Sequence, residues 1–82
     1  MTNDEFVERK MHEVPQNRQK DFKELSAAVG YDSTRMQCIA KALRFGIERE
    51  YLEHLIVLGS TKALLNGVLD YIQKYNLKSV ML

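Results

Sequence analysis

The clearest candidate for chemistry is the hydroxyl of Ser33, in the stretch Gly30-Tyr31-Asp32-Ser33. This stretch lies between two apolar segments that both have helical periodicity. Two roles suit a serine in the first turn of a helix, directly after a glycine turn. Either Asp32 or Ser33 caps the helix by accepting a hydrogen bond from a backbone N–H group, or Ser33 is the point at which another group is attached.

The other side chains of catalytic type are scattered along the chain. His12, Cys38 and His54 lack the paired spacing of a zinc site, so we expect no metal. The sequence has neither a glycine-rich phosphate-binding loop nor a Gly-x-Ser-x-Gly motif. A helical chain of 82 residues also has little room for a substrate pocket of the usual size. We therefore expect a protein that is not an enzyme.

Composition and charge indicate a single cytoplasmic domain over residues 1–82, with residues 1–2 and 77–82 mobile. The one cysteine, Cys38, cannot form an internal disulfide, which favours a reducing compartment. The longest aliphatic run, residues 55–58, is too short to cross a bilayer, so we expect no membrane partner. The polar, acidic start is no signal peptide, and with the initiating methionine it favours a free-standing chain.

Hydrophobic periodicity predicts the helices that precede Ser33. The first helix is expected to begin near Asn3 and to be stopped by Pro15. Residues 15–21 are polar apart from the proline and predict a surface loop. Helical spacing then relates four residues that lead up to Gly30, namely Phe22, Leu25, Ser26 and Val29.

A helix over residues 33–45 is the most regular element of the pattern. Its predicted inward face consists of Met36, Ile39, Ala40 and Leu43. The periodicity suggests that the opposite face, which includes Cys38, is exposed, and a buried, inert Cys38 is the alternative. Residues 47–58 predict a helix or a structured loop. The last helix follows Gly59-Ser60-Thr61, and its predicted buried stripe consists of Leu64, Leu65, Val68, Leu69 and Ile72. The whole pattern predicts a small all-α bundle.

One interpretation of these helices is a helix-turn-helix DNA-binding motif, with residues 33–45 as the recognition helix. Small Ser26, the glycine turn and the apolar residues around it fit the steric pattern of that motif. In this interpretation Thr34, Gln37 and Lys41 face the base edges, and Arg35 and Arg44 contact phosphates. A net charge of +1 argues against it, because affinity for nucleic acid depends mainly on the density of Lys and Arg.

A second interpretation rests on a family resemblance. Gly30-Tyr31-Asp32-Ser33 is similar to the Gly-x-Asp-Ser motif of acyl and peptidyl carrier proteins, which serve fatty-acid, polyketide and nonribosomal-peptide assembly. The apolar residues Leu25 and Val29 before the motif, and Ile39 and Leu43 after it, also match the family. The C-terminal stretch LLNGVLDYIQKY resembles the last helix of the family, so the resemblance covers the chain end to end.

The resemblance implies a small all-α four-helix bundle of the carrier-protein type. It implies that a phosphopantetheinyl transferase attaches 4′-phosphopantetheine to Ser33, and that the thiol of this arm carries an acyl or aminoacyl group as a thioester. Asp32 would position either the metal-bound cofactor of the transferase or Ser33 itself. The implied docking face for the acyl- or aminoacyl-loading and condensing enzymes consists of Thr34, Arg35, Gln37, Cys38 and Lys41.

The physical chemistry of a helix start agrees with this role for Ser33. The first backbone N–H groups of a helix have no partner within the helix, and its N-terminal end is positive, so a phosphate bonded there is stabilised. A third interpretation is a helical adaptor or inhibitor without chemistry of its own, in which Ser33 is only a cap.

Overall fold

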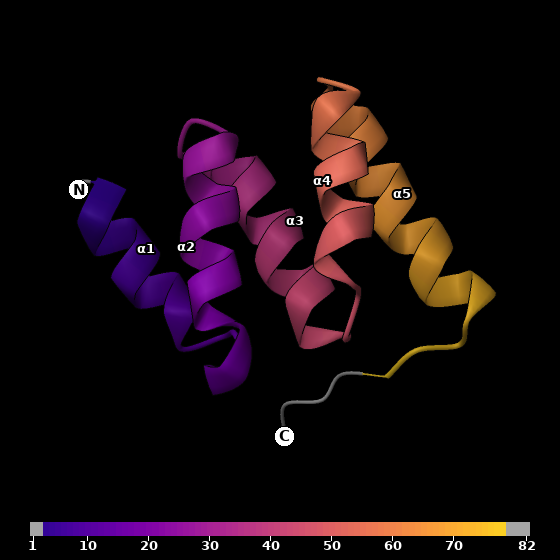
Figure 1. The fold of residues 1–82 in the computed structure, drawn as a ribbon, viewed down its shortest axis with the longest axis horizontal. Coiled ribbons are helices and arrows are strands. Elements are labelled where there is room, and N and C mark those ends of the chain that lie inside the picture. Colours follow the sequence, from indigo (N-terminus) through magenta and orange to yellow (C-terminus); the bar gives the residue numbers. More distant parts are fainter. Residues whose placement is uncertain (1–2, 79–82) are drawn as a thin grey trace.

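The chain folds into a bundle of helices (Figure 1). The computed structural model describes residues 3–78, without the side chains of Asn3, Asp4 and Phe6. The predicted all-α class is confirmed, because every regular element in the described range is helical. These elements are α1 (Asn3–Met11), the 3-10 turn η1 (Gln16–Arg18), α2 (Gln19–Ala28), α3 (Ser33–Arg44), α4 (Arg49–Val57) and α5 (Thr61–Lys74).

The number of helices differs from that of the four-helix bundle expected from the carrier resemblance. Residues 3–78 form five α-helices, and Ser33 begins the third of them. The segment 47–58, expected as a helix or a structured loop, forms α4. The predicted mobility of residues 1–2 and 77–82 falls mostly outside the described range and stays a prediction.

Two helical hairpins, α2–α3 and α4–α5, make up most of the bundle, and α1 lies beside α2 (Figure 1). Each hairpin turns at a glycine in the left-handed region, Gly30 with φ 64° and Gly59 with φ 81°. In each, a polar side chain caps the second helix by accepting from the backbone N–H three residues on. These caps are Asp32, at 3.0 Å, and Ser60, at 2.9 Å. The two hairpins are therefore built by the same local rules.

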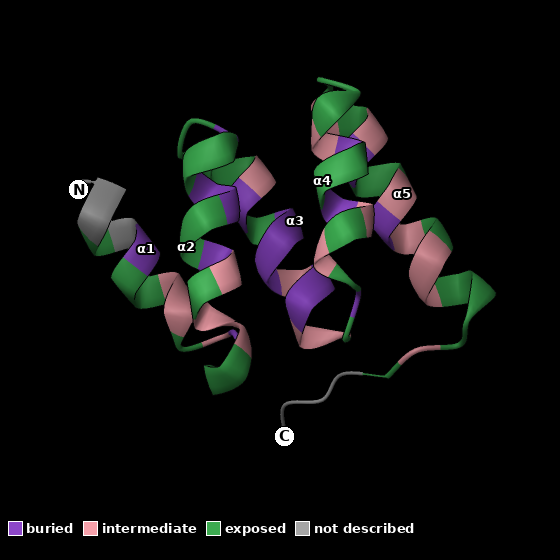
Figure 2. Cartoon of the chain, viewed as in Figure 1, coloured by how far each residue is buried: buried purple, intermediate pink, exposed green. Residues whose placement is uncertain are grey.

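The helix that Ser33 begins, α3, is the centre of the fold. It packs against each of the other four helices, and Figure 2 shows it largely buried. Ile39 and Leu43 are fully buried, as predicted. The complete buried set of α3 is Met36, Cys38, Ile39, Ala40, Ala42 and Leu43. Burial on more than one face leaves only a narrow exposed strip along this helix.

The predicted buried face of α5 is only partly correct. Leu64 and Val68 are buried, but Leu65 is 41% exposed, and Leu69 and Ile72 are half-buried. The buried face is thus narrower than the run of apolar residues suggests.

Gly67 explains where the buried face of α5 lies. A Cβ atom at Gly67 would lie 2.7 Å from Cδ1 of Leu55, so the Leu55 side chain of α4 packs directly on the backbone of α5 at Gly67. The hydroxyl of Tyr51 also donates a hydrogen bond to the Gly67 carbonyl oxygen, at 3.3 Å. Leu65 and Leu69 lie on the side of α5 opposite Gly67, so they face away from this contact with α4.

The predicted surface loop over residues 15–21 is wrong, because η1 and the first turn of α2 occupy most of it. A polar sequence does not prevent a helix here, since this first turn lies at the surface. Two arginines also hold it against the start of the second hairpin. Arg18 Nη2 donates to the carbonyl oxygen of Ile47 at 2.8 Å, and Arg49 Nη1 lies 2.9 Å from Asp21 Oδ1.

Ser26 of α2 provides a stability test of this core. It is fully buried, and its Oγ has no hydrogen-bond partner among the described residues. We expect Ser26→Ala to raise the free energy of unfolding by about 1 kcal/mol, because it removes a desolvated hydroxyl and introduces a better helix former. Urea denaturation measures this, with Ser60→Ala as the matched control. That variant loses a hydroxyl that caps α5 and should cost about 1 kcal/mol. A destabilised Ser26→Ala would contradict the assignment of an unpaired hydroxyl.

Candidate functional site

Ser33 is the first residue of α3, and its side chain is exposed. The sequence left open whether Asp32 or Ser33 caps this helix. The structure shows that Asp32 does, since its Oδ2 accepts the hydrogen bond from the backbone N–H of Arg35. Within residues 3–78, the Ser33 hydroxyl makes no hydrogen bond. It is therefore not needed for the local structure.

The turn before Ser33 is tightly specified. Gly30 and Tyr31 are both left-handed, with φ values of 64° and 58°. This conformation costs a residue with a side chain about 1–2 kcal/mol. Hydrogen bonds from the N–H of Tyr31 to the carbonyl oxygen of Ser26, at 2.9 Å, and from Gly30 to Ala27, at 3.0 Å, hold it. The turn thus fixes the position of Ser33 relative to α2.

Arg35, predicted for the docking face, is engaged within the fold. Its Nε donates to Thr61 Oγ1 at 3.0 Å, and its Nη2 donates to the carbonyl oxygen of Gly59 at 3.1 Å. These bonds tie the start of α3 to the turn between α4 and α5. Arg35 therefore positions the helix start that carries Ser33, and two of its three guanidinium nitrogens already have acceptors.

Cys38, also predicted for the docking face, is buried, with 7% of its surface exposed. The prediction that it is exposed is wrong, because α5 packs against the side of α3 on which Cys38 lies. Burial raises the pKa of its thiol above the ordinary value, although nearby Lys41 acts in the opposite direction. A thiol with a raised pKa is a poor nucleophile at neutral pH.

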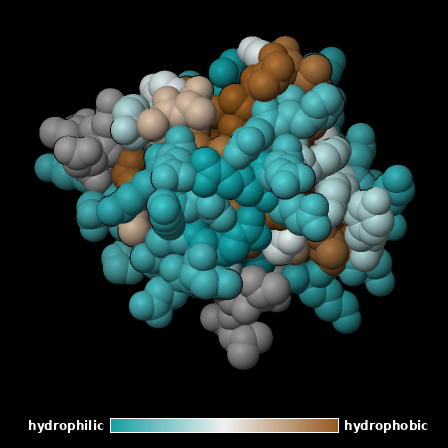
Figure 3. All heavy atoms as spheres, in the orientation of Figure 1, coloured by the Kyte–Doolittle hydropathy of each residue, from teal (hydrophilic) through white to brown (hydrophobic). Residues whose placement is uncertain are grey.

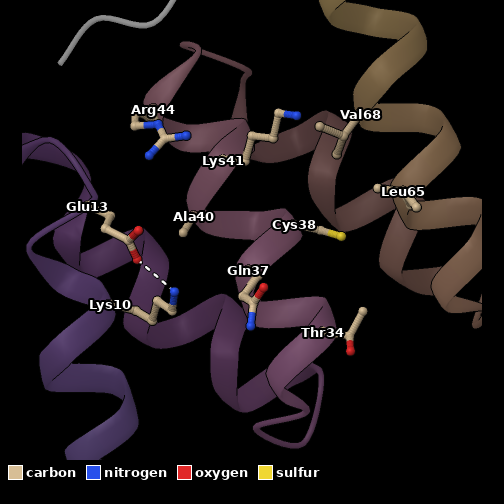
Figure 4. A pocket seen from close by; sticks show the side chains of 10 residues that line it. All are labelled: Lys10, Glu13, Thr34, Gln37, Cys38, Ala40, Lys41, Arg44, Leu65 and Val68. Atoms are coloured by element: carbon tan, nitrogen blue, oxygen red, sulfur yellow. Dashed lines mark ion pairs between the residues drawn. The ribbon is translucent and has the colours of Figure 1, made fainter. Parts of the chain in front are cut away.

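The remaining docking residues line a groove of about 360 Å³, which we name the α3 groove (Figure 4). Its floor is the exposed strip of α3, formed by Thr34, Gln37, Lys41 and Arg44. Thr34 and Gln37 are exposed, whereas Lys41 and Arg44 are half-buried.

The two walls of the α3 groove come from helices far apart in the sequence. Lys10 and Glu13, at the end of α1 and just after it, form one wall and pair with each other at 3.0 Å. Leu65 and Val68 of α5 form the other wall (Figure 4). The sequence alone gave no signal that these two segments flank α3.

A second surface feature lies near Ser33 that sequence reasoning missed. Figure 3 shows hydrophobic atoms gathered where the α4–α5 turn lies, and Val57 and Leu58 there are 82% and 58% exposed. Because Arg35 binds the carbonyl oxygen of Gly59, this apolar turn flanks the start of α3. The signal was present in the four consecutive apolar residues 55–58, since a helix cannot bury four in a row on one face.

Neither a metal centre nor a membrane span is found in the part of the chain that the structure describes. Its His, Cys, Asp and Glu residues form no group of three that could hold a metal ion. None of its helices is both long enough and apolar enough to cross a bilayer.

Comparisons with protein-family models, with curated proteins and with solved structures found no match to this chain.

Proposed function

We propose that the chain is an acyl or peptidyl carrier protein of the cytoplasm, with 4′-phosphopantetheine attached to Ser33. One observation carries the proposal: the Ser33 hydroxyl is exposed at a fixed helix start, while Asp32 performs the capping that would otherwise explain a serine there. In the transfer, Ser33 Oγ forms a bond to phosphorus as the pyrophosphate bond of coenzyme A breaks. The nucleotide part leaves, and the serine proton passes to a base of the transferase.

The surroundings of Ser33 support each part of this proposal. The positive end of α3 stabilises the new phosphodiester. Arg35 and the left-handed turn hold Ser33 at a defined point, so a transferase meets an ordered hydroxyl. Exposed Val57 and Leu58 next to the helix start offer apolar contact to the transferase or to loading and condensing enzymes. The chain itself catalyses no step.

The test is intact mass spectrometry after incubation with coenzyme A, Mg²⁺ and a broad-specificity phosphopantetheinyl transferase. We expect the wild-type chain to gain one phosphopantetheine arm and Ser33→Ala to gain none. Thr34→Ala, which removes the neighbouring exposed hydroxyl, is the matched control and should be modified fully. Because Asp32 is the cap, Ser33→Ala should change stability by less than about 0.5 kcal/mol. An unmodified wild-type chain, or a modified Ser33→Ala, would refute the proposal.

A second function, helix-turn-helix DNA binding through α3, is favoured by the packing of α2 against α3. The turn glycine, Gly30, is left-handed, and the positions that the motif requires to be apolar or small are all buried. These positions are Leu25, Ser26, Val29, Met36 and Ile39. Two of the proposed phosphate and base contacts, Lys41 and Arg44, nevertheless lie half-buried on the floor of the α3 groove, and Arg35 is engaged with the α4–α5 turn. Duplex DNA is the ligand that distinguishes this function from the first.

A further inference from the structure

Two cations of the α3 groove have no partner among the residues that the structure describes. Lys41 and Arg44 lie one turn apart on α3, and both are half-buried. Neither takes part in an ion pair or a hydrogen bond within residues 3–78. The adjoining charged wall adds no net negative charge, since Lys10 and Glu13 pair with each other. A half-buried cation has lost part of its hydration. An anion that enters the groove is therefore attracted to it more strongly than to a fully solvated lysine.

The opposite wall of the groove is apolar. Leu65 is 41% exposed, and Val68 and Cys38 lie beneath it at the contact between α5 and α3. In Figure 4, Arg44 lies toward α1, whereas Leu65 and Val68 lie on the far side of Lys41. A ligand in the groove thus meets positive charge along one edge and aliphatic surface along the other.

The length of the groove indicates the shape of this ligand. The floor runs from Thr34 to Arg44, which at the rise of an α-helix corresponds to about 15 Å, or three turns. An amphipathic helix of similar length can place carboxylates one turn apart against Lys41 and Arg44, with a leucine-type side chain against Leu65.

We propose that the α3 groove binds an acidic amphipathic helix of a partner protein. Charge complementarity selects an acidic ligand, and the wall at Leu65 selects one with an apolar face. Duplex DNA fits less well, because it brings no apolar side chain to Leu65 and its phosphates must reach between α1 and α5 to contact Lys41. The inference does not depend on modification of Ser33, which does not line the groove.

The test measures binding of a designed peptide to the full chain by fluorescence anisotropy. The probe is a labelled helical peptide of about 15 residues, with Glu pairs on one face and Leu on the adjoining face. A second peptide carries Gln in place of Glu. We expect the Glu peptide to bind at least about tenfold more tightly than the Gln peptide at low salt, and this difference to shrink as salt rises.

Charge reversal locates the binding site. The double variant Lys41→Glu, Arg44→Glu should weaken binding of the Glu peptide by about tenfold or more. The control, Lys20→Glu with Lys23→Glu, lowers the net charge by the same amount but at exposed positions of α2. At moderate salt, which screens long-range charge effects, this control should bind the Glu peptide with wild-type affinity. If circular dichroism shows that the charge-reversed variant does not fold, the double variant Lys41→Gln, Arg44→Gln removes both positive charges without introducing repulsion.

Three results would overturn the inference. The first is equal binding of the Glu and Gln peptides, and the second is equal loss of affinity in the groove variants and the α2 control. The third is mixed-sequence duplex DNA that binds more tightly than the Glu peptide and displaces it, which would assign Lys41 and Arg44 to nucleic acid. Ser33→Ala should bind the peptide normally, so failure of the carrier proposal leaves this inference standing, and the reverse also holds.

Discussion

Leu43→Ala is expected to destabilise the protein by about 2–5 kcal/mol, because it opens a cavity where the central helix meets its neighbours. Leu43 is fully buried on α3, which packs against each of the other helices. A small domain has only about 5–15 kcal/mol of stability in total, so this single change should remove a large part of it. Urea denaturation followed by circular dichroism measures the loss as a shift of the midpoint with little change of slope.

Leu69→Ala is the matched control, since it removes the same atoms from α5. Leu69 is only half-buried, and the groups around it are already in contact with water. Its cost should be less than half that of Leu43→Ala. Equal costs for the two variants would mean that α5 is rotated from the orientation described.

Gly67→Ala should destabilise the protein by about 1–3 kcal/mol, although alanine is the better helix former by about 1 kcal/mol. The new methyl group would lie 2.7 Å from Cδ1 of Leu55 and closer still to its Cδ2, and Leu55 is only 5% exposed, so its side chain has little room to move. The hydrogen bond from Tyr51 to the Gly67 carbonyl oxygen would weaken as α4 and α5 separate.

A double-mutant cycle isolates the clash between Gly67 and Leu55. Leu55→Ala alone creates a cavity, but in the Gly67→Ala background the new methyl group partly fills that cavity. The destabilisations of the two single variants should therefore add up to more than the destabilisation of the double variant. Asn66→Ala, at the exposed neighbouring position of α5, controls for helix propensity and should be neutral or slightly stabilising. Stabilisation by Gly67→Ala would contradict the close crossing of α4 and α5.

Local sequence signals predicted the parts of the fold that local interactions decide. The limits of α3 follow from a glycine turn, a capping aspartate and a regular apolar stripe, and Ile39 and Leu43 are buried as that stripe requires. The start of α2 was missed because its first turn is polar. Its contacts with Ile47 and Arg49 come from residues almost thirty positions away.

The features that local sequence patterns did not predict depend on packing between residues far apart in the chain. Periodicity placed Leu65 and Leu69 in the core of α5, but the absence of a side chain at Gly67 brings α4 to a different face. In the candidate site, the exposure of Ser33 follows from its place at a helix start. The engagement of Arg35 with Thr61 and the burial of Cys38 depend on where the second hairpin docks.

The enclosed position of α3 also determines which segments of the molecule resist local unfolding. It packs against all four other helices, so we expect the amides of residues 36–43 to be among the slowest to exchange with solvent. In contrast, α1 packs mainly on α2 and α3 and makes fewer contacts with them than the hairpin helices make with each other, so we expect its amides to exchange sooner. The two walls of the α3 groove therefore differ in how firmly they are held: Leu65 and Val68 belong to a helix packed on both α3 and α4, whereas Lys10 and Glu13 lie at the end of the less tightly packed α1.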